Sequence, residues 1–200
     1  MTELNEADRA SRDAVIRALL PLVPQAGWTA RGIAAALRDA GLPEEEATFL
    51  FPRGPVGAIE AWLDLADREM AEAAGDLSEL RTPDRIRALI ATRLRQAGPH
   101  REAVRQALAV QSLPWNVGSA LRTVARTANA MWHAAGDSSA DFSWYTRRAS
   151  LGAVYGATLA FWLRDESEDI GPTLDFLDRR LAGLARVGKL RRRCSTARAA

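Results

Sequence analysis

The sequence predicts an all-α fold of about nine helices. Apolar residues recur at the i, i+3, i+4, i+7 spacing of helices along most of the 200 residues, and alternating strand patterns are nearly absent. Gly and Pro pairs divide these segments into lengths typical of helices joined by short loops. With 48% hydrophobic and 26% charged residues, the composition is that of a globular protein that buries a core.

The first two helices are predicted from their end signals. Asn5 stands where a side chain can cap the first helix, and Pro21 and Pro24 are expected to end it, because proline cannot donate a helical hydrogen bond. Thr29 is expected to cap the second helix, which should end at Gly41. A short acidic segment follows this glycine.

The later helices begin at similar signals. The predicted starts are Gly54-Pro55, Thr82-Pro83-Asp84, Gly98-Pro99 and Gly171-Pro172. A helix over about 141–165 is predicted to be the longest, and Gly152, Gly156 and Ala160 form a seam of small residues along it. Such a seam favours close packing against another helix of the same chain, a second copy or a ligand.

Charge divides the chain unevenly. Residues 186–200 contain six Lys and Arg and no acid, so residues 1–185 carry a net charge of −4 within the total of +2. The alkaline pI therefore describes the end of the chain and does not indicate a nucleic-acid-binding body. We divide the sequence into a head (1–54), a body (55–187) and a basic tail (188–200).

The predicted location is the cytoplasm. No stretch approaches the roughly 18 consecutive apolar residues of a membrane span, and the acidic N-terminal residues do not resemble a secretory signal. Cys194 is the single cysteine, which excludes an internal disulfide and a Cys-rich metal site.

Residues 6–75 have the pattern of a helix-turn-helix head. The run over 49–54, Phe-Leu-Phe-Pro-Arg-Gly, resembles the corresponding corner of tetracycline-repressor-type regulators, whose third helix enters the DNA major groove. Here that helix begins with the three carboxylates of Glu44–Glu46, which oppose contact with a polyanion. The nearby cations are Arg31, Arg38 and Arg53. We expect the architecture without DNA binding, and keep a ligand-sensing repressor as the alternative function.

Residues 131–149 combine large aromatic side chains with charges beside a turn. Trp144 and Tyr145 are adjacent, so on a helix they point about 100° apart and do not share one narrow core stripe. Trp, Tyr and Arg are the residue types that most often dominate protein interfaces. The interpretation is a partner-binding surface, with a broad buried face as the alternative. The predicted partner-binding residues are Asp141, Trp144, Tyr145 and Arg148.

Two catalytic interpretations of this run are weaker. His133, Asp137 and Asp141 are too few for a convincing set of metal ligands. A triad of Ser138 or Ser139 with His133 lacks the surrounding nucleophile-elbow pattern. We therefore predict no enzyme activity, no metal and no cofactor.

The same run resembles the signature of the coenzyme Q nine family, which are accessory proteins of ubiquinone biosynthesis. The matching residues are Met131-Trp132-His133, Ala135-Gly136-Asp137, Ser139, Asp141-Phe142 and Trp144-Tyr145-Thr146-Arg147-Arg148-Ala149. A later segment (Thr173, Asp175-Phe176-Leu177, Arg179-Arg180) and an earlier one (Gly27-Trp28-Thr29) extend the similarity to roughly residues 10–187.

This resemblance implies a tetracycline-repressor-like fold and a homodimer, with the last two helices as the dimer interface by analogy. It implies a non-enzymatic protein that binds isoprenoid quinone intermediates or other lipids in an apolar pocket and presents them to a ring hydroxylase. The family's patch for that hydroxylase falls on Asp141, Trp144 and Tyr145.

A polyprenyl tail requires only an apolar cavity, because each buried CH₂ contributes about 0.8 kcal/mol. The predicted lipid-binding residues are Leu108, Leu121, Val124, Val154, Leu159 and Trp162. Simple core packing is the alternative for each of them.

The basic tail is the predicted membrane contact. The family usually ends in an amphipathic helix that touches the bilayer, whereas here the apolar stripe fades after Leu184 into a cationic run. The predicted membrane-contact residues are Lys189, Arg191, Arg192 and Arg193. They predict peripheral attachment to the inner face of the membrane, with a solvated tail as the alternative.

Overall fold

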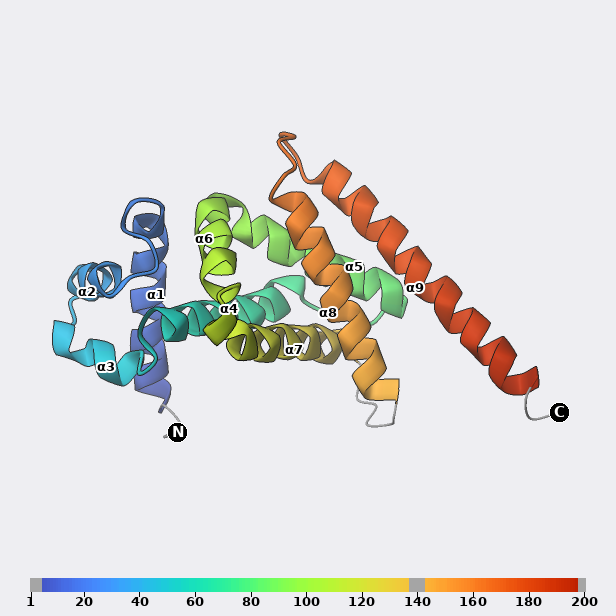
Figure 1. The fold of residues 1–200 in the computed structure, drawn as a ribbon, viewed down its shortest axis with the longest axis horizontal. Coiled ribbons are helices and arrows are strands. Elements are labelled where there is room, and N and C mark those ends of the chain that lie inside the picture. The colour runs from blue at the N-terminus through green and yellow to red at the C-terminus, as the bar shows by residue number, and fades with distance from the viewer. Residues whose placement is uncertain (1–4, 137–142, 198–200) are drawn as a thin grey trace.

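The computed structural model describes residues 5–136 and 143–197, with side chains described up to Leu184 except those of residues 143–145 and 147 (Figure 1). In these residues the regular structure is helical and no strand occurs, as the sequence predicts. The α-helices are α1 (Glu6–Ala26), α2 (Ala30–Asp39), α3 (Ala47–Leu50), α4 (Gly54–Ala74), α5 (Thr82–Ala97), α6 (Arg101–Gln111), α7 (Val117–Ala134), α8 (Ser143–Trp162) and α9 (Gly171–Ala197). Short 3-10 helices, η1 (Glu44–Glu46), η2 (Gly98–His100) and η3 (Pro114–Asn116), precede α3, α6 and α7.

The head lies at one end of the molecule and α4 connects it to the body (Figure 1). α1 packs against α2 and α4, and α4 packs along α5 and α7. α8 packs against both α7 and α9, at the end opposite to the head. Helices from distant parts of the sequence therefore surround the middle of the body.

The predicted helix starts are largely confirmed. The Asn5 side chain accepts a hydrogen bond from the Asp8 N–H at 2.8 Å, and the Thr29 hydroxyl accepts one from the Gly32 N–H at 3.0 Å. α5 begins at Thr82, at the predicted Thr82-Pro83-Asp84 start, with Arg81 rather than Thr82 in the capping position.

The prediction that Pro21 and Pro24 end the first helix is wrong. α1 continues to Ala26, and both prolines lie on its exposed side. Leu20 and Val23, on the same two turns, are buried in the core. Burying a large aliphatic side chain contributes about 1.5–3 kcal/mol, so the two together offset much of the roughly 3 kcal/mol that each proline costs inside a helix.

The prediction that the helix near residues 141–165 is the longest is also wrong. α8 has 20 residues, whereas α9 has 27 and continues through the cationic run to Ala197. Lys, Arg and Leu are good helix formers, so a helix can persist there after its apolar stripe has faded.

The proposed third helix of the head is divided and short. η1 supplies its acidic start and α3 adds four residues, about 6 Å of helix. Arg38 forms an ion pair with Glu44, and Arg53 Nη1 lies 2.6 Å from Glu60 Oε1. Two of the three cations near the turn are therefore already engaged by carboxylates.

Two stacked indoles join the head to the body. The rings of Trp28 and Trp62 have centroids 5.3 Å apart, and both residues are buried. Trp28 Nε1 also donates a hydrogen bond to the Ala103 carbonyl of α6 at 3.0 Å.

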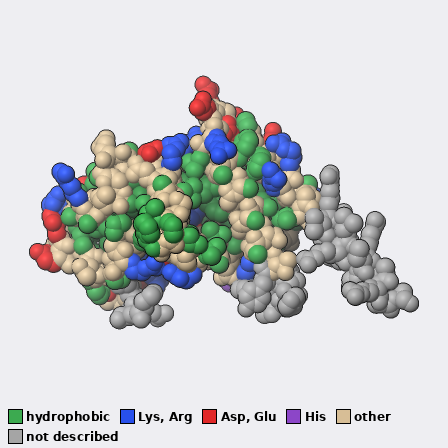
Figure 2. Space-filling view, in the orientation of Figure 1, with side chains coloured by type: hydrophobic (Ala, Val, Ile, Leu, Met, Phe, Trp, Pro, Cys, Tyr) green, Lys and Arg blue, Asp and Glu red, His purple; other side chains and the backbone are tan. Residues whose placement is uncertain are grey.

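On the outside of the body, hydrophobic side chains gather over α6 and the start of α7 (Figure 2).

Candidate functional site

A cavity of about 290 Å³ lies in the middle of the body. Six helices (α1, α4, α5, α6, α7 and α8) and η2 contribute to its wall, which is mainly apolar. Its apolar lining residues are Leu20, Trp62, Leu63, Leu65, Ala66, Ala97, Val104, Ala107, Leu108, Val124 and Leu159. The volume is at the lower end of the roughly 300–1,000 Å³ typical of small-molecule sites. Its contents are therefore limited to a small molecule or one end of a longer one.

One part of the wall carries a buried ion pair. Arg93 Nη1 of α5 lies 3.0 Å from Asp67 Oδ1 of α4, and the two side chains are only 4% and 7% exposed. The Thr127 hydroxyl of α7 donates to Asp67 Oδ2 at 3.0 Å. Burial raises the pKa of Asp67 despite the opposing effects of Arg93 and Thr127. The guanidinium thus reaches the cavity already bound to a carboxylate behind it.

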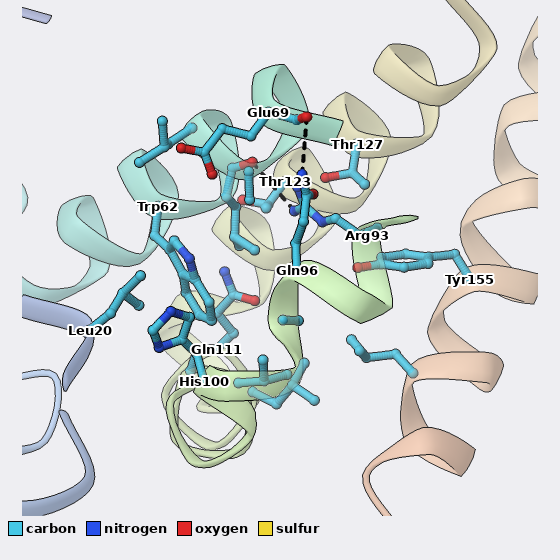
Figure 3. A pocket seen from close by; sticks show the side chains of 18 of the residues that line it. Leu20, Trp62, Glu69, Arg93, Gln96, His100, Gln111, Thr123, Thr127 and Tyr155 are labelled. Carbon is cyan, nitrogen blue, oxygen red and sulfur yellow. Dashed lines mark hydrogen bonds between the residues drawn. The ribbon is translucent and has the colours of Figure 1, made fainter. Parts of the chain in front are cut away.

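Tyr155 of α8 faces Arg93 across the cavity (Figure 3). Burial acts to lower the pKa of Arg93, but interactions with Tyr155 and Asp67 prevail and raise it. The cavity therefore has a cationic and hydroxylic region beside its apolar wall.

Two glutamine side chains present unpaired atoms near this region. Gln96 Nε2 donates to the Glu69 carbonyl at 3.1 Å, while its buried Oε1 has no hydrogen-bond partner among the described residues. Gln111 is 7% exposed, and its buried Nε2 is likewise unpartnered in the described part of the chain. A buried polar atom without a partner costs about 1–3 kcal/mol, so a ligand that carries both an acceptor and a donor would relieve two such costs.

His100 also lines the cavity, as do Arg17, Glu69, Thr123 and Thr127. Burial lowers the pKa of this imidazole, although the carboxylate of Glu69 acts in the opposite direction. The side chain is therefore expected to be neutral at pH 7 and to add no charge to the cavity.

The structure divides the six predicted lipid-binding residues into three groups. Leu108, Val124 and Leu159 line the cavity. Leu121 is 66% exposed on the outside of α7 and does not line it. The two remaining residues, Val154 and Trp162, are buried in the packing of α8 and do not line it either.

Trp162 has a structural contact of its own. The Arg101 guanidinium at the start of α6 lies 4.7 Å from the Trp162 ring centroid and also donates to the Trp162 carbonyl. This pair fixes the end of α8 against α6.

The predicted partner-binding residues are only partly described. Asp141 lies outside the described residues, as do the side chains of Trp144 and Tyr145 at the start of α8. Arg148 is 9% exposed, and its Nε donates to Asn129 Oδ1 of α7 at 2.9 Å. The contact ties α8 to α7.

The predicted membrane-contact and metal residues are also largely undescribed. α9 includes the positions of Lys189 and Arg191–Arg193, but their side chains lie outside the described set. Asp137 lies outside it as well. Among described residues, no three His, Cys, Asp or Glu side chains gather as metal ligands would. Nor is any helix, within the same residues, both long and apolar enough to cross a membrane.

Sequence reasoning did not identify the polar residues of the cavity. Arg93 lies three residues after Ile90 and four after Leu89, so it shares the apolar stripe of α5. A charge at such a position is a signal of a buried pair or a site. Gln111 carried no comparable signal, because a glutamine near a helix end is normally solvated.

Comparison with known proteins identifies the second half of the fold. Residues 117–188, from the start of α7 well into α9, match the family model described as COQ9. The resemblance predicted from residues 131–149 is thereby confirmed.

Similarity to COQ9 proteins extends well beyond those residues. The chain is 32% identical over 191 residues to "Ubiquinone biosynthesis protein COQ9, mitochondrial" of Rattus norvegicus, covering 92% of this chain and 61% of that protein. It is 32% identical over 191 residues to the Homo sapiens protein of the same name, covering 92% and 60%. The chain thus spans about three fifths of the length of these relatives.

The fold has a solved counterpart. A crystal structure of a TetR transcriptional regulator from Nitrosomonas europaea superposes with a TM-score of 0.68 at 28% identity, covering 87% of this chain and 97% of that one. The predicted tetracycline-repressor-like fold is confirmed.

Proposed function

We propose that the chain is a non-enzymatic lipid-binding accessory protein of ubiquinone biosynthesis. In this role it holds an isoprenoid quinone intermediate in the cavity and presents it to a ring hydroxylase. The observation that carries the proposal is the cavity of about 290 Å³, with an apolar wall and a few convergent polar groups. The match to the COQ9 family model and the names of the homologous proteins supply the pathway.

The cavity chemistry suits a molecule with a polar ring and an apolar tail. Gln96 Oε1 and Gln111 Nε2 offer one acceptor and one donor, and Tyr155 adds a hydroxyl. A hydroxylated or carbonyl-bearing ring satisfies these atoms, while isoprene carbons cover the aliphatic wall. Because the volume is small, a long tail must extend beyond the cavity.

Native mass spectrometry of the chain purified with its lipids tests this proposal. The expected result is a bound isoprenoid that is lost when the protein is unfolded. A protein that never retains a lipid, even after incubation with short-chain ubiquinone, contradicts the proposal. Salt-sensitive binding to duplex DNA would instead support the repressor alternative.

The hydroxylase is proposed to bind near the start of α8, on Asp141, Trp144 and Tyr145. Arg148, which is buried and bonded to Asn129, is proposed to hold α8 in place for this contact. The support is the sequence signature, together with the fact that α8 also supplies cavity-lining residues. We expect Trp144→Ala to weaken capture of the hydroxylase with little change in melting temperature. A large drop in melting temperature with capture intact would assign Trp144 to the core.

The chain is further proposed to act as a homodimer at the inner face of the membrane. Support for the dimer is a stripe of small exposed residues on α8, namely Ala153, Gly156, Ala157 and Ala160. The cationic end of α9 supports membrane attachment. Sedimentation of Gly156→Arg tests the dimer, since a bulky charge on that stripe should leave a monomer.

A further inference from the structure

α7 buries a row of hydroxyl side chains along one face. Ser119, Thr123 and Thr127 recur every four residues and are 3%, 5% and 2% exposed. Ser119 donates its hydroxyl to the Glu60 carboxylate and Thr127 donates to Asp67, both on α4. Hydroxyl groups thus occupy the positions where a core-facing helix normally carries aliphatic side chains.

Three aliphatic residues in the first half of the same helix are consequently exposed in part, whereas Ala128 and Met131 further along it are buried. Val117, Leu121 and Val124 follow the i, i+4, i+7 spacing and are 45%, 66% and 42% exposed. Trp115, in η3 just before the helix, is 77% exposed. Together they form what we call the α6–α7 apolar patch, which consists of Leu108, Leu113, Trp115, Val117, Leu121 and Val124. Figure 2 shows hydrophobic side chains gathered over these elements.

The surroundings of the patch are cationic. Residues 103–136, which include most of α6 and all of η3 and α7, contain Arg105, Arg122 and Arg126 and no Asp or Glu. Arg105 is paired with Glu102 in the first turn of α6, and Arg126 lies 4.0 Å from the Asp67 carboxylate of α4. Two acids of α4 contact α7. Glu60 is already paired with Arg53 and hydrogen-bonded by Ser119, and Asp67 is already paired with Arg93 and hydrogen-bonded by Thr127. A partner for this face must therefore accept apolar side chains at the centre and positive charge around them.

The patch is continuous with the cavity. Leu108 and Val124 belong to both the exposed set and the cavity wall. A molecule that leaves the cavity past these two side chains enters the surroundings of the patch. If those surroundings were water, an isoprenoid would lose about 0.8 kcal/mol per exposed CH₂ on the way.

We propose that the α6–α7 apolar patch docks on an anionic lipid bilayer, with Trp115 at the headgroup level and the cavity opening toward the lipid. Tryptophan is enriched at the membrane interface, and an apolar face flanked by arginines is typical of helices that lie on anionic membranes. This inference rests on the proposed function, since it supplies the route by which an apolar ligand passes between bilayer and cavity. It assigns membrane contact to the body in addition to the basic tail.

Vesicle co-sedimentation of the full chain tests this surface. The probes are vesicles of phosphatidylcholine alone and of phosphatidylcholine mixed with phosphatidylglycerol. The double variant Trp115→Ser/Leu121→Ser is expected to need at least about tenfold more mixed vesicles for half-maximal binding, because two apolar side chains no longer enter the lipid. The matched control is Phe49→Ser, which removes a 54% exposed aromatic from the head and should bind as wild type does.

Three outcomes would overturn the proposal. The first is unchanged vesicle binding by the double variant while replacement of Arg191, Arg192 and Arg193 by Gln abolishes it. The second is equal loss in the Phe49→Ser control. The third is conversion of a dimer to a monomer by the double variant, since the patch would then be a contact between copies of the chain. Circular dichroism melting of each variant verifies that it is folded.

The same experiments separate this inference from the proposed function. If the purified wild-type chain retains an isoprenoid but the double variant binds vesicles normally, only the docking surface is wrong. If vesicle binding depends on Trp115 but no lipid is ever retained, the docking surface stands and the proposed function is wrong.

Discussion

Partial filling of the cavity by Ala107→Phe is the most direct test of the proposed lipid site. Ala107 of α6 is 4% exposed and lines the cavity. The substitution adds a ring of six carbons. If only half of them enter the cavity, space for about three ligand CH₂ groups is lost, which weakens binding by about 2.4 kcal/mol or roughly fiftyfold.

The unliganded variant should remain folded. Overfilling a packed core costs about 1–3 kcal/mol, but here the ring enters existing space and buries its own apolar surface, so the two effects largely cancel. The expected change in the free energy of unfolding is therefore small compared with the change in ligand affinity.

The assay is retention of short-chain ubiquinone, measured by native mass spectrometry beside urea denaturation of the ligand-free protein. Ala109→Phe is the matched control, because this alanine is exposed on the same helix and does not line the cavity. Equal retention by wild type and Ala107→Phe, with both folded, would refute the assignment of the cavity as the lipid site.

Three further predictions concern stability. Arg93→Met removes the closer and buried ion-pair partner of Asp67 and leaves only Arg126 at 4.0 Å, which should cost about 3 kcal/mol at pH 7 by urea denaturation. Because burial raises the pKa of Asp67 in the folded state, the loss should shrink toward acidic pH, where the protonated carboxyl needs no partner, and a pH-independent loss would contradict this. The lowered pKa of His100 predicts that stability falls as the pH decreases below about 6.5, since the unfolded chain then binds the proton more readily; His100→Gln should flatten that part of the pH profile. On α8, a Cβ at Gly152 would lie 2.9 Å from a methyl of Val124 on α7, so Gly152→Ala should destabilise the fold. Gly156→Ala, whose Cβ has nothing within 4 Å inside one copy of the chain, should instead stabilise a single copy by about 1 kcal/mol in thermal melts.

Local signals in the sequence were sufficient for most helix boundaries. The caps at Asn5 and Thr29 form as predicted, because a cap requires only a side chain and backbone within four residues of each other. The prediction that Pro21 and Pro24 end the first helix fails for a non-local reason. Those two turns persist because neighbouring residues are buried against other helices, a contribution that local sequence does not contain.

The candidate cavity was predicted only in outline. Periodicity distinguishes inward-facing from outward-facing positions, but it does not distinguish a core position from a cavity wall. Val154 and Leu159 are both inward-facing residues of α8, yet only Leu159 reaches the cavity. The first half of α7 departs from the usual pattern, because Ser119 and Thr123 face inward and Leu121 faces outward.

The sequence by itself determined the helical class, the relation to COQ9 proteins and the tetracycline-repressor-like order of helices, since all of these depend on patterns along the chain. Only the tertiary structure decided that six helices leave a cavity between them and that Arg93 and Asp67 form an ion pair beside it. It also decided that Val117, Leu121 and Val124 of α7 are exposed. The physical reason is that an empty volume and a buried ion pair depend on how surfaces from distant segments fit together, and no single helix specifies that fit.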